Sequence, residues 1–453
     1  MMNISLNEIA KTIGCPSVAN DIAIANIFRD TRETLPNSLF IAISGKNFDG
    51  HDFAAEAFEK GAVATVVSHL ITGISPEKQL VVPDTKLAYL QIGGLIRSKS
   101  RAKVIAITGS AGKTTTKEQL KFILSPFAKV YTTDKNLNND IGVAKTLCSM
   151  PPDAEIAIIE IGMSAAGKIA SRVAHVRPDI AIITNIHPMH LEFFENFEGI
   201  AHAKAEVFSG LSNSGTAIIN RDADFFPILE KEAKTRTKNV FLYSADDIIS
   251  SNGPQITAKI HNMNVTFELA EDTGQNLMNA LCSLNTAAAL DLDIGKCAAR
   301  IKDFDAPPGR GKIHTLALYE GAYKLMDHSY SAQPESLKLA ILALGKASAG
   351  RKIAIIGKMA EIGEKSREMH EMIGRTIAST DIGIVVGVCP ETRDILSQIP
   401  DRETHFFENA DGLAAHLLSE IIRPGDTVLI KGSHYGSQLY KTAGELIAAG
   451  TAQ

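Results

Sequence analysis

The chain has 453 residues, of which 45% are hydrophobic and 21% charged, and it carries a formal net charge of −5. This composition is typical of a globular protein. The length exceeds what one hydrophobic core usually supports. The acidic balance argues against a nucleic-acid-binding protein with a broad basic face. No apolar run is long enough for membrane insertion, no export signal opens the sequence, and the five cysteines are scattered, so we expect a cytoplasmic protein without disulfides or a cysteine metal site.

The first block of the chain, residues 1–100, predicts a small α/β domain. Apolar runs at residues 39–43 and 62–67 are typical of buried strands, and residues 52–60 between them have a helical pattern. The polar run at residues 97–101 then indicates a domain boundary near residue 100.

The second block, residues 101–309, repeats buried strands followed by helices. Strands are expected at residues 104–108, 156–160, 180–184 and 216–220. Continuous apolar runs that alternate with helices indicate a parallel sheet covered on both faces. Two prolines and a glycine at residues 307–309 break regular structure and mark a second boundary. The third block, residues 310–453, shows the same alternation, with strands expected at residues 352–357, 382–388 and 427–431.

Residues 104–117 carry the most informative motif, an apolar run that ends in a Gly-x-x-Gly loop before Lys-Thr-Thr-Thr. Gly109 and Gly112 let the backbone N–H groups of the loop turn toward phosphate oxygens, and the following helix adds the positive end of its dipole. Lys113 is placed to reach the β- and γ-phosphates of a nucleoside triphosphate, and Thr114 to ligate Mg²⁺. The motif is shorter than the strict eight-residue pattern, which requires glycine where this chain has Ile107. The alternative is a turn without a ligand, which leaves Lys113 and Thr114 unexplained.

Polar side chains follow the next predicted strands, and ligands of parallel sheets gather at the C-terminal ends of strands. Glu160 ends the run at residues 156–160, where a carboxylate can coordinate Mg²⁺ or form an ordinary salt bridge. His190 follows the strand expected at residues 180–184. A lone histidine is more often structural, but beside Glu160 and the nucleotide loop it would complete a second metal site.

Three further segments each allow two interpretations. Lys204 lies beside the buried stripe of a helix expected at residues 200–208, where a lysine is usually solvated. Residues 136–142 place three asparagines before a glycine, either as a plain turn or as a donor-rich loop that faces substrate or phosphate. Asn276 opens an alanine-rich helix, and alone it would be interpreted as the helix cap.

Together these segments resemble the Mur ligase superfamily, the ATP-dependent amide-forming enzymes of peptidoglycan precursor synthesis. The resemblance spans nearly the whole chain and follows the order of the family's motifs. The matching segments are residues 108–116, 136–142, 160–162, 184–192, 203–208, 276–280 and 308–311.

Segments outside the central block resemble one branch of this family, which attaches D-alanyl-D-alanine to UDP-N-acetylmuramoyl-tripeptide. Residues 327–336 and 356–364 resemble C-terminal motifs of that branch, and residues 30–32 and 38–51 resemble its UDP-sugar-binding domain. The sister branch that adds diaminopimelate or lysine carries an Asp-Asn-Pro-Arg motif, which this chain lacks. Departures in the third block bear on the acceptor more than on the nucleotide chemistry. They are His328, Ser331 and Gln333 in place of Asp, Asn and Asn, and Lys358 in place of Asp.

The resemblance implies three α/β domains: a small UDP-sugar-binding domain at residues 1–100, a central P-loop ATPase domain with a parallel sheet at residues 101–309, and a C-terminal Rossmann-like domain at residues 310–453 that receives the dipeptide. It further implies ATP and two Mg²⁺ ions as cofactors, an acyl phosphate formed from the tripeptide carboxylate, and attack on it by the dipeptide amine. We expect a monomer that binds no nucleic acid and does not insert into a membrane.

The site residues that follow from the motifs and the resemblance fall into three groups. Those expected to act in catalysis or to hold metal ions are Lys113, Thr114, Glu160, His190 and Lys204, the last as a carbamylated lysine. Those expected to bind ATP are Gly109, Ser110, Ala111, Gly112, Lys113, Thr114, Thr115, Asn279, Arg310 and Asp327. Those expected to bind substrate are Asp30, Thr31, Arg32, Lys46, Asp49, Gly50, His51, Asn138, Asn139 and Tyr330.

Three other functions stay open at this point. A folylpolyglutamate synthetase has a similar ATP-binding half, but it gives no reason for the segment at residues 45–51. A nucleotide-dependent switch or motor would hydrolyse ATP without an acceptor. A paralogue that binds UDP-sugars without ligating them would account for the departures in the third block.

Overall fold

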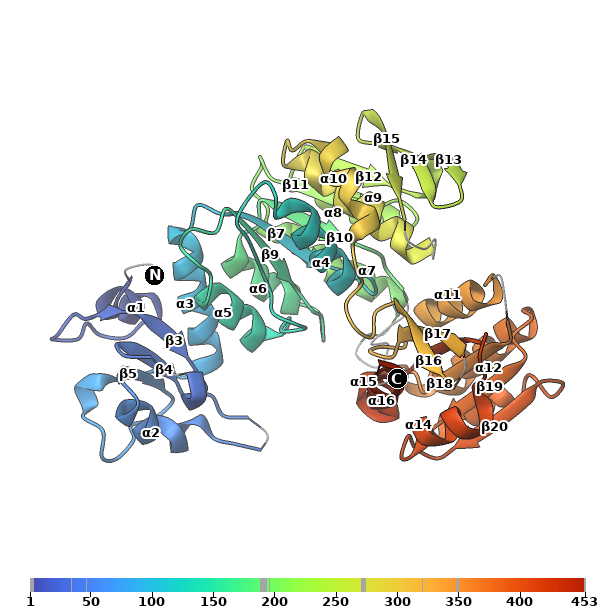
Figure 1. Cartoon of the computed structure of the whole chain (residues 1–453). Helices are drawn as coiled ribbons and strands as arrows, with labels where there is room; N and C mark the ends of the chain where they lie inside the picture. Colours follow the sequence, from blue (N-terminus) through green and yellow to red (C-terminus); the bar gives the residue numbers. More distant parts are fainter. Residues whose placement is uncertain are drawn as a thin grey trace.

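The computed structural model describes residues 4–33, 35–45, 47–187, 194, 196–269, 274–319, 321–347 and 350–451. Within these residues the chain forms three α/β units that follow one another in sequence, with the central unit between the other two (Figure 1). Each unit is built around a mainly parallel sheet. The predicted α/β fold with three domains is confirmed.

The N-terminal unit holds a parallel sheet of strand order β3–β4–β5–β6 and a short antiparallel pair, β1–β2. Its strands are β1 Ile4–Ser5, β2 Ala23–Ile24, β3 Asn26–Phe28, β4 Ser38–Ile41, β5 Ala62–Val67 and β6 Gln79–Val81. Its helices are α1 Leu6–Thr12, α2 Ala54–Glu59 and α3 Thr85–Lys99.

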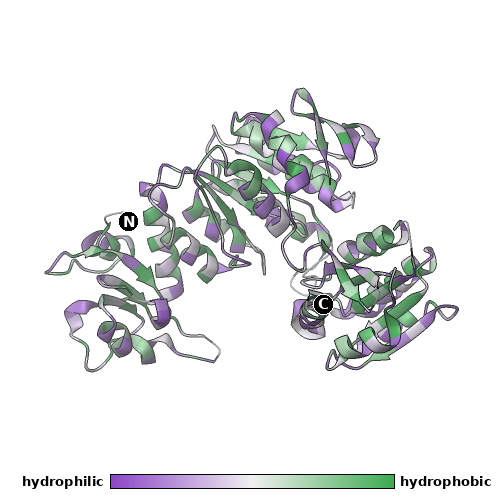
Figure 2. Cartoon of the chain, viewed as in Figure 1, coloured by the Kyte–Doolittle hydropathy of each residue, from purple (hydrophilic) through white to green (hydrophobic). Residues whose placement is uncertain are grey.

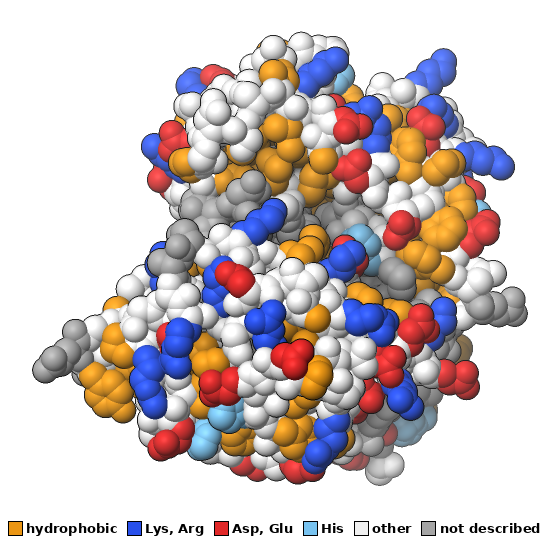
Figure 3. All heavy atoms as spheres, turned by 90° about the vertical axis from the view of Figure 1, so that its right-hand side faces the viewer, with side chains coloured by type: hydrophobic (Ala, Val, Ile, Leu, Met, Phe, Trp, Pro, Cys, Tyr) orange, Lys and Arg blue, Asp and Glu red, His pale blue; other side chains and the backbone are white. Residues whose placement is uncertain are grey.

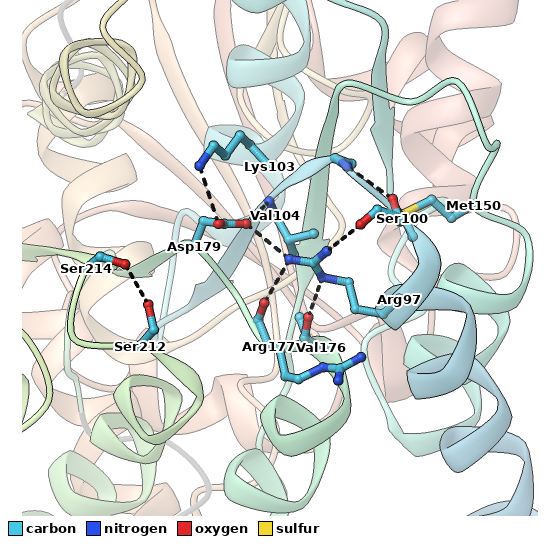
Figure 4. A network of polar contacts seen from close by, with 11 residues as sticks. Arg97, Ser100, Lys103, Val104, Met150, Val176, Arg177, Asp179, Ser212 and Ser214 are labelled. Carbon is cyan, nitrogen blue, oxygen red and sulfur yellow. Dashed lines mark hydrogen bonds and ion pairs between the residues drawn. The ribbon is translucent and has the colours of Figure 1, made fainter. Parts of the chain in front are cut away.

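Helix α3 joins the N-terminal unit to the central one and packs on α5 Asp140–Cys148 and α6 Lys168–Val176. At its last turn Arg97 forms a polar clamp with the end of α6 and the segment that follows it (Figure 4). The guanidinium donates to Val176 O at 3.0 Å and to Arg177 O at 3.1 Å, and it pairs with Asp179 at 3.1 Å. The Arg97 side chain is only 12% exposed, so these bonds are largely shielded from water.

Arg97→Met is expected to destabilise the protein by about 3 kcal/mol, because it removes a shielded donor from two backbone carbonyls and the cation that pairs with the Asp179 carboxylate. Urea-induced unfolding followed by circular dichroism measures the change. Arg101→Met is the matched control, since Arg101 is exposed. An equal loss in both variants would contradict the role of the clamp.

The central unit holds a parallel sheet of strand order β12–β11–β10–β7–β9–β8 and an antiparallel sheet, β13–β14–β15. Its strands are β7 Lys103–Thr108, β8 Val130–Thr132, β9 Ile156–Glu160, β10 Ile180–Ile183, β11 Thr216–Asn220, β12 Asn239–Tyr243, β13 Ile248–Asn252, β14 Gln255–Ile260 and β15 Met263–Glu268. Besides α5 and α6, its helices are α4 Lys113–Leu124, α7 Phe197–Ala205, α8 Phe226–Lys234, α9 Gly274–Ala289 and α10 Ile294–Arg300. In the register of the main sheet Ile107 lies between Glu160 and Ile182, so the ends of β7, β9 and β10 meet at one edge.

The C-terminal unit holds a sheet of strand order β16–β17–β21–β18–β19–β20, in which β16 is antiparallel to β17 and the other pairs are parallel. Its strands are β16 Lys312–Leu318, β17 Gly321–His328, β18 Lys352–Gly357, β19 Ile384–Val388, β20 Glu403–Phe407 and β21 Thr427–Lys431. Its helices are α11 Pro334–Gly345, α12 Ser366–Ala378, α13 Arg393–Leu396, α14 Leu413–His416, α15 His434–Ser437 and α16 Leu439–Thr451.

The strands are the most apolar parts of the fold, and helices with mixed faces cover them (Figure 2). One apolar cluster runs without interruption from the N-terminal sheet through α3 into the central unit. The C-terminal sheet has apolar clusters of its own on its two faces. The first two units therefore share a core, whereas the third is packed around separate clusters of its own.

The surface carries both signs of charge. On the face drawn in Figure 3, lysine and arginine side chains are interspersed with aspartate and glutamate among the described residues. Within the described part of the chain, none of the helices combines the length and apolar character that crossing a membrane requires.

Candidate functional site

The Gly-x-x-Gly loop connects the end of β7 to the start of α4, as the motif predicts. Gly109 and Gly112 have φ angles of +149° and +79°, which favour glycine. A Cβ atom on Gly112 would lie 2.7 Å from Asn279 Oδ1, and one on Gly109 would overlap Thr184 Oγ1. The first N–H groups of α4 have no carbonyl four residues before them inside the helix, so they form a donor-rich end.

Two lysines converge on one carbonyl of this loop. Lys113 Nζ donates to Gly109 O at 2.7 Å, and Lys204 Nζ donates to the same oxygen at 3.1 Å. Lys204 is 1% exposed, so the solvated interpretation of this residue is wrong. Burial, with the charge of Lys113 as a second cause, lowers the pKa of Lys204 well below its ordinary value. Burial also lowers the pKa of Lys113, against the opposing effect of Glu160.

Beside the loop, a hydroxyl and a carboxylate form a pair of oxygen donors. Thr114 Oγ1 donates to Glu160 Oε2 at 2.9 Å, and Asn138 Nδ2 donates to Glu160 Oε1 at 2.8 Å. Glu160 is 1% exposed and its partners are neutral groups, so its negative charge is held by hydrogen bonds and by the nearby Lys113. The predicted adjacency of the nucleotide loop and Glu160 is present in the structure.

A cavity of about 230 Å³ opens between the central and C-terminal units at this point. From the central unit it is lined by residues 110–115 and by Asn136, Asn138, Glu160, Gln275, Asn276 and Asn279. From the linker and the C-terminal unit it is lined by Gly309, Arg310, His328, Tyr330, Ser331, Gln333, Ser336, Leu339, Ala340 and Lys431.

The C-terminal wall of this cavity is cationic. The Arg310 guanidinium lies 4.3 Å from the centre of the Tyr330 ring, in a cation–π contact. Lys431 is 4% exposed, and its Nζ donates to Ser331 O at 2.9 Å. Burial and the charge of Arg310 lower the pKa of Lys431 to about 7, although Asp327 opposes the shift. Burial and the neighbouring Lys431 lower the pKa of His328 to about 3, so its imidazole is neutral at pH 7.

Asn279 separates this cavity from a second one of about 200 Å³, which it also lines together with Thr115 and Asn276. Its Oδ1 accepts from Thr116 Oγ1 at 3.3 Å and from Gln275 Nε2 at 2.9 Å. Its Nδ2 is buried and has no partner among the described residues. A buried amide donor of this kind is costly unless a ligand accepts from it.

The residues predicted to bind substrate in the N-terminal unit form two small clusters. Asp30 pairs with Arg32, whose Nε donates to it at 2.8 Å, and this pair holds the pKa of Asp30 well below its usual value. Thr31 Oγ1 donates to Glu56 at 3.0 Å. On the neighbouring loop, Asp49, Gly50 and His51 are consecutive, and the buried His51 imidazole lies 2.6 Å from Asp49 Oδ1. His51 Nε2 accepts from Ser68 N at 2.9 Å, so the proton sits on Nδ1 and is donated to Asp49.

Some residues predicted to belong to the site lie away from the cavity or outside the described residues. Asn139 is the N-cap of α5, where its side chain accepts from Gly142 N at 2.8 Å. Asp327 is 2% exposed and lies behind the cavity wall, where its carboxylate accepts from Gly309 N at 2.7 Å and from Ser329. Lys46 and His190 lie outside the described residues.

Asn185 and Lys431 are two of the residues at the site that sequence reasoning did not assign. Asn185 accepts from Ser110 N at 3.0 Å through its backbone and from Ala111 N at 2.7 Å through its side chain, and so it fixes the loop. Lys431 reaches the cavity from the end of β21. Asn185 could have been found because it follows the apolar strand β10, whereas the position of Lys431 depends on how two units meet.

Three family models match the chain. They are the Mur ligase family catalytic domain at residues 23–89, the Mur ligase middle domain at residues 107–287, and the Mur ligase, glutamate ligase domain at residues 316–434. The UDP-N-acetylmuramoyl-tripeptide–D-alanyl-D-alanine ligase of Escherichia coli (strain K12) is 33% identical over 447 residues, which cover 96% of this chain and 96% of that protein.

Solved structures agree with these matches along the whole fold. MurF from Acinetobacter baumannii superimposes with a TM-score of 0.87 at 26% identity, covering 99% of this chain and 100% of that one. MurF ligase from Thermotoga maritima, solved in complex with ADP, gives a TM-score of 0.81 at 26% identity, with 94% and 98% coverage. The chain therefore belongs to the Mur ligase family, among the UDP-N-acetylmuramoyl-tripeptide–D-alanyl-D-alanine ligases.

Proposed function

We propose that this protein joins D-alanyl-D-alanine to the tripeptide of UDP-N-acetylmuramoyl-tripeptide in the cytoplasm, with ATP as the energy source. The observation that carries the proposal is the meeting of Lys113 and Glu160 from the central unit with Arg310 and Lys431 from the C-terminal unit around one cavity. The UDP-N-acetylmuramoyl-tripeptide–D-alanyl-D-alanine ligase of Escherichia coli aligns with 96% of this chain, which supports the same substrates here.

The cationic lining suits the first chemical step. A carboxylate oxygen of the tripeptide attacks the γ-phosphorus, the bond to the β-phosphate oxygen breaks, and ADP leaves. Two anions must approach each other, so Lys113, Arg310 and Lys431 are needed to offset their repulsion in a site of low dielectric. The dipeptide amine, after losing a proton, then attacks the carbonyl carbon of the acyl phosphate, and phosphate leaves as the amide forms. Closure of the C-terminal unit would keep water from the acyl phosphate.

Thr114 and Glu160 fit a magnesium ion, because they are hard oxygen donors at the cavity wall. Among the described residues, no group of three or more His, Cys, Asp or Glu side chains is assembled for a metal. Mg²⁺ commonly takes one or two protein oxygens and completes its shell with phosphate and water, so Thr114 and Glu160 are enough protein donors for it. When bound, the ion would neutralise phosphate charge and orient the γ-phosphate. His190 is the proposed ligand of a second ion.

Lys204 is proposed to be carbamylated, which would turn a buried amine into a metal-bridging carboxylate. The amine must be neutral to add to carbon dioxide, and burial beside Lys113 favours that form. Mass spectrometry of the intact protein in bicarbonate buffer tests the proposal. A free ammonium at Lys204 in crystals grown with Mg²⁺ and bicarbonate would contradict it.

The adenine of ATP is proposed to lie near Asn279, between the two cavities that this residue lines. Its buried, unpartnered Nδ2 would donate to a ring nitrogen of the base. The second cavity offers apolar side chains of Ile301 and Phe304 for contact with the ring. The stacked Arg310 would contact phosphate, and Asp327 would hold the linker that presents Arg310.

The departures from the family pattern lie in two places. His328, Ser331 and Gln333 line the same cavity as the nucleotide loop. Lys358 lies elsewhere, at the end of β18, where its Nζ pairs with Glu391 at 3.2 Å. The first three replacements therefore bear on the shape of the nucleotide cavity, and D-alanyl-D-alanine stays the proposed acceptor.

Incubation of the purified protein with UDP-N-acetylmuramoyl-tripeptide, D-alanyl-D-alanine and MgATP tests the function. We expect a product heavier by one dipeptide less water, with ADP and phosphate formed in equal amounts. Phosphate release that needs neither precursor nor dipeptide would indicate a switch or motor instead. Binding of the precursor without any turnover would indicate a paralogue that does not ligate.

The affinity for MgATP is expected to fall as the pH rises through 7. Lys431 has a pKa of about 7 in the free protein, so it is charged below pH 7 and loses its attraction for phosphate above it. If bound phosphate keeps the ammonium charged, the dissociation constant rises about fivefold between pH 7 and pH 8. Calorimetric titration measures this, and Lys431→Met should bind more weakly at pH 6.5 with a flatter profile. Parallel profiles for the two proteins would contradict the assignment.

A further inference from the structure

Lys117 is a fully buried lysine that the proposed chemistry does not use. It lies one turn after Lys113 on α4, and its side chain is 0% exposed. Its ammonium donates to Thr133 O at 2.6 Å and to Lys135 O at 2.9 Å, and it pairs with Glu118 at 2.9 Å. Three donors thus meet three acceptors, which is what a buried ammonium requires. Two of those acceptors belong to the loop between β8 and α5.

That loop holds Glu160 at both its backbone and its side chain. Thr133 is fully buried, and its Oγ1 accepts from Glu160 N at 3.0 Å. Five residues later, Asn138 Nδ2 donates to Glu160 Oε1 at 2.8 Å, and Asn138 O accepts from Gly162 N at 2.9 Å. Between these anchors Lys135 has a φ of +48°, a left-handed conformation that a non-glycine residue keeps only when its surroundings fix it.

We propose that Lys117 is a positioning residue for the metal-binding side of the site. Its ammonium fixes the carbonyls of residues 133 and 135, and the loop so fixed holds the Glu160 carboxylate against Thr114. Helix α4 thereby contributes two residues to the position of Glu160. Thr114 contacts Glu160 directly, and Lys117 acts through the loop between β8 and α5. This inference rests on the proposed role of Glu160 as a magnesium ligand.

Binding of MgADP and of metal-free ADP, measured by calorimetry on the full chain, tests the inference without any turnover. Lys117→Met should weaken MgADP binding by about tenfold or more, as loss of an outer-sphere contact does, while metal-free ADP changes by less than about twofold. Lys121→Met is the matched control, one turn further along the same helix and exposed, and it should leave both affinities unchanged. A Lys117→Met protein whose preference for MgADP over ADP equals that of the parent would overturn the proposal.

A second variant covers the case in which Lys117→Met does not fold. Thr133→Val is nearly isosteric and removes only the Oγ1 that accepts from Glu160 N. It therefore breaks the chain of contacts from Lys117 to Glu160 at the Glu160 end. It should also reduce the preference for MgADP, and an unchanged preference would count against this chain of contacts. In a double-mutant cycle, Lys117→Met and Asn138→Ala should be non-additive, because both act on one carboxylate; additive effects would contradict the coupling.

Glu160→Gln separates the metal role of Glu160 from the positioning role of Lys117. If Glu160→Gln leaves the preference for MgADP intact, the metal role of Glu160 fails, and this inference fails with it. If Glu160→Gln abolishes the preference and Lys117→Met does not alter it, only the positioning role of Lys117 is lost.

Discussion

Lys113→Ala is expected to lower the rate of ligation by about 100- to 1,000-fold, as loss of one pre-organised charge donor does in other active sites. The ammonium lies at the cavity wall beside Glu160 and is fixed by Gly109 O at 2.7 Å. Burial lowers the pKa of Lys113 and Glu160 opposes the shift, and an incoming triphosphate would favour the charged ammonium further. Its removal takes one of the positive charges away from the cavity in which the carboxylate is proposed to approach the γ-phosphate.

Coupled detection of ADP at saturating substrates measures this rate. Lys121→Ala serves as the control, because this exposed lysine lies on the same helix and does not line the cavity. Thermal unfolding of both variants shows whether a loss of rate reflects a loss of fold. Ligation by Lys113→Ala at near the parent rate would refute the assigned role.

Glu160→Ala is expected to raise the Mg²⁺ concentration at half-maximal activity by about tenfold or more, since it removes the carboxylate of the proposed ion site. High Mg²⁺ should restore part of the rate, because Thr114 and the phosphates still bind the ion. Glu155→Ala is a suitable control, as this exposed carboxylate lies at the opposite end of the same strand. A Mg²⁺ titration identical to that of the parent would contradict metal coordination by Glu160.

The strands of the central and C-terminal units were largely predictable, because each is a continuous apolar run buried on both sides. Strands expected at residues 156–160, 216–220, 352–357 and 427–431 have the observed bounds. The strand expected at residues 62–67 in the N-terminal unit also has the observed bounds, and elsewhere the ends differ by one or two residues. The strand expected at residues 39–43 is observed at Ser38–Ile41, because residues 42 and 43 are apolar but have left the regular ladder. An apolar pattern records burial, and burial continues past the last ladder hydrogen bond.

The site was predictable where its residues are close in sequence to a strand end. Gly109, Thr114 and Glu160 follow from the rule that parallel strands end at a common edge. The burial of the Lys204 side chain was not predictable, because helical spacing placed this residue only at the margin of the apolar stripe. The role of Asn139 as a helix cap was hidden among three neighbouring asparagines. Lys431 belongs to the C-terminal unit and lies more than a hundred residues after the nucleotide loop in the sequence. No local sequence pattern encodes how the two units meet.

The apolar core beneath α3 determines where the chain can be divided without exposing buried side chains to water. Leu90 and Ile96 of α3 pack in one cluster with Val143 and Leu147 of α5. A fragment that begins after α3 would therefore expose the apolar face of α5 to water and aggregate. A cut at residues 307–309 leaves both neighbouring cores whole, since the apolar clusters of the C-terminal unit begin beyond it. Separate expression of residues 1–309 and 310–453 should therefore give two soluble pieces, and a shortened first piece that begins after α3 should aggregate.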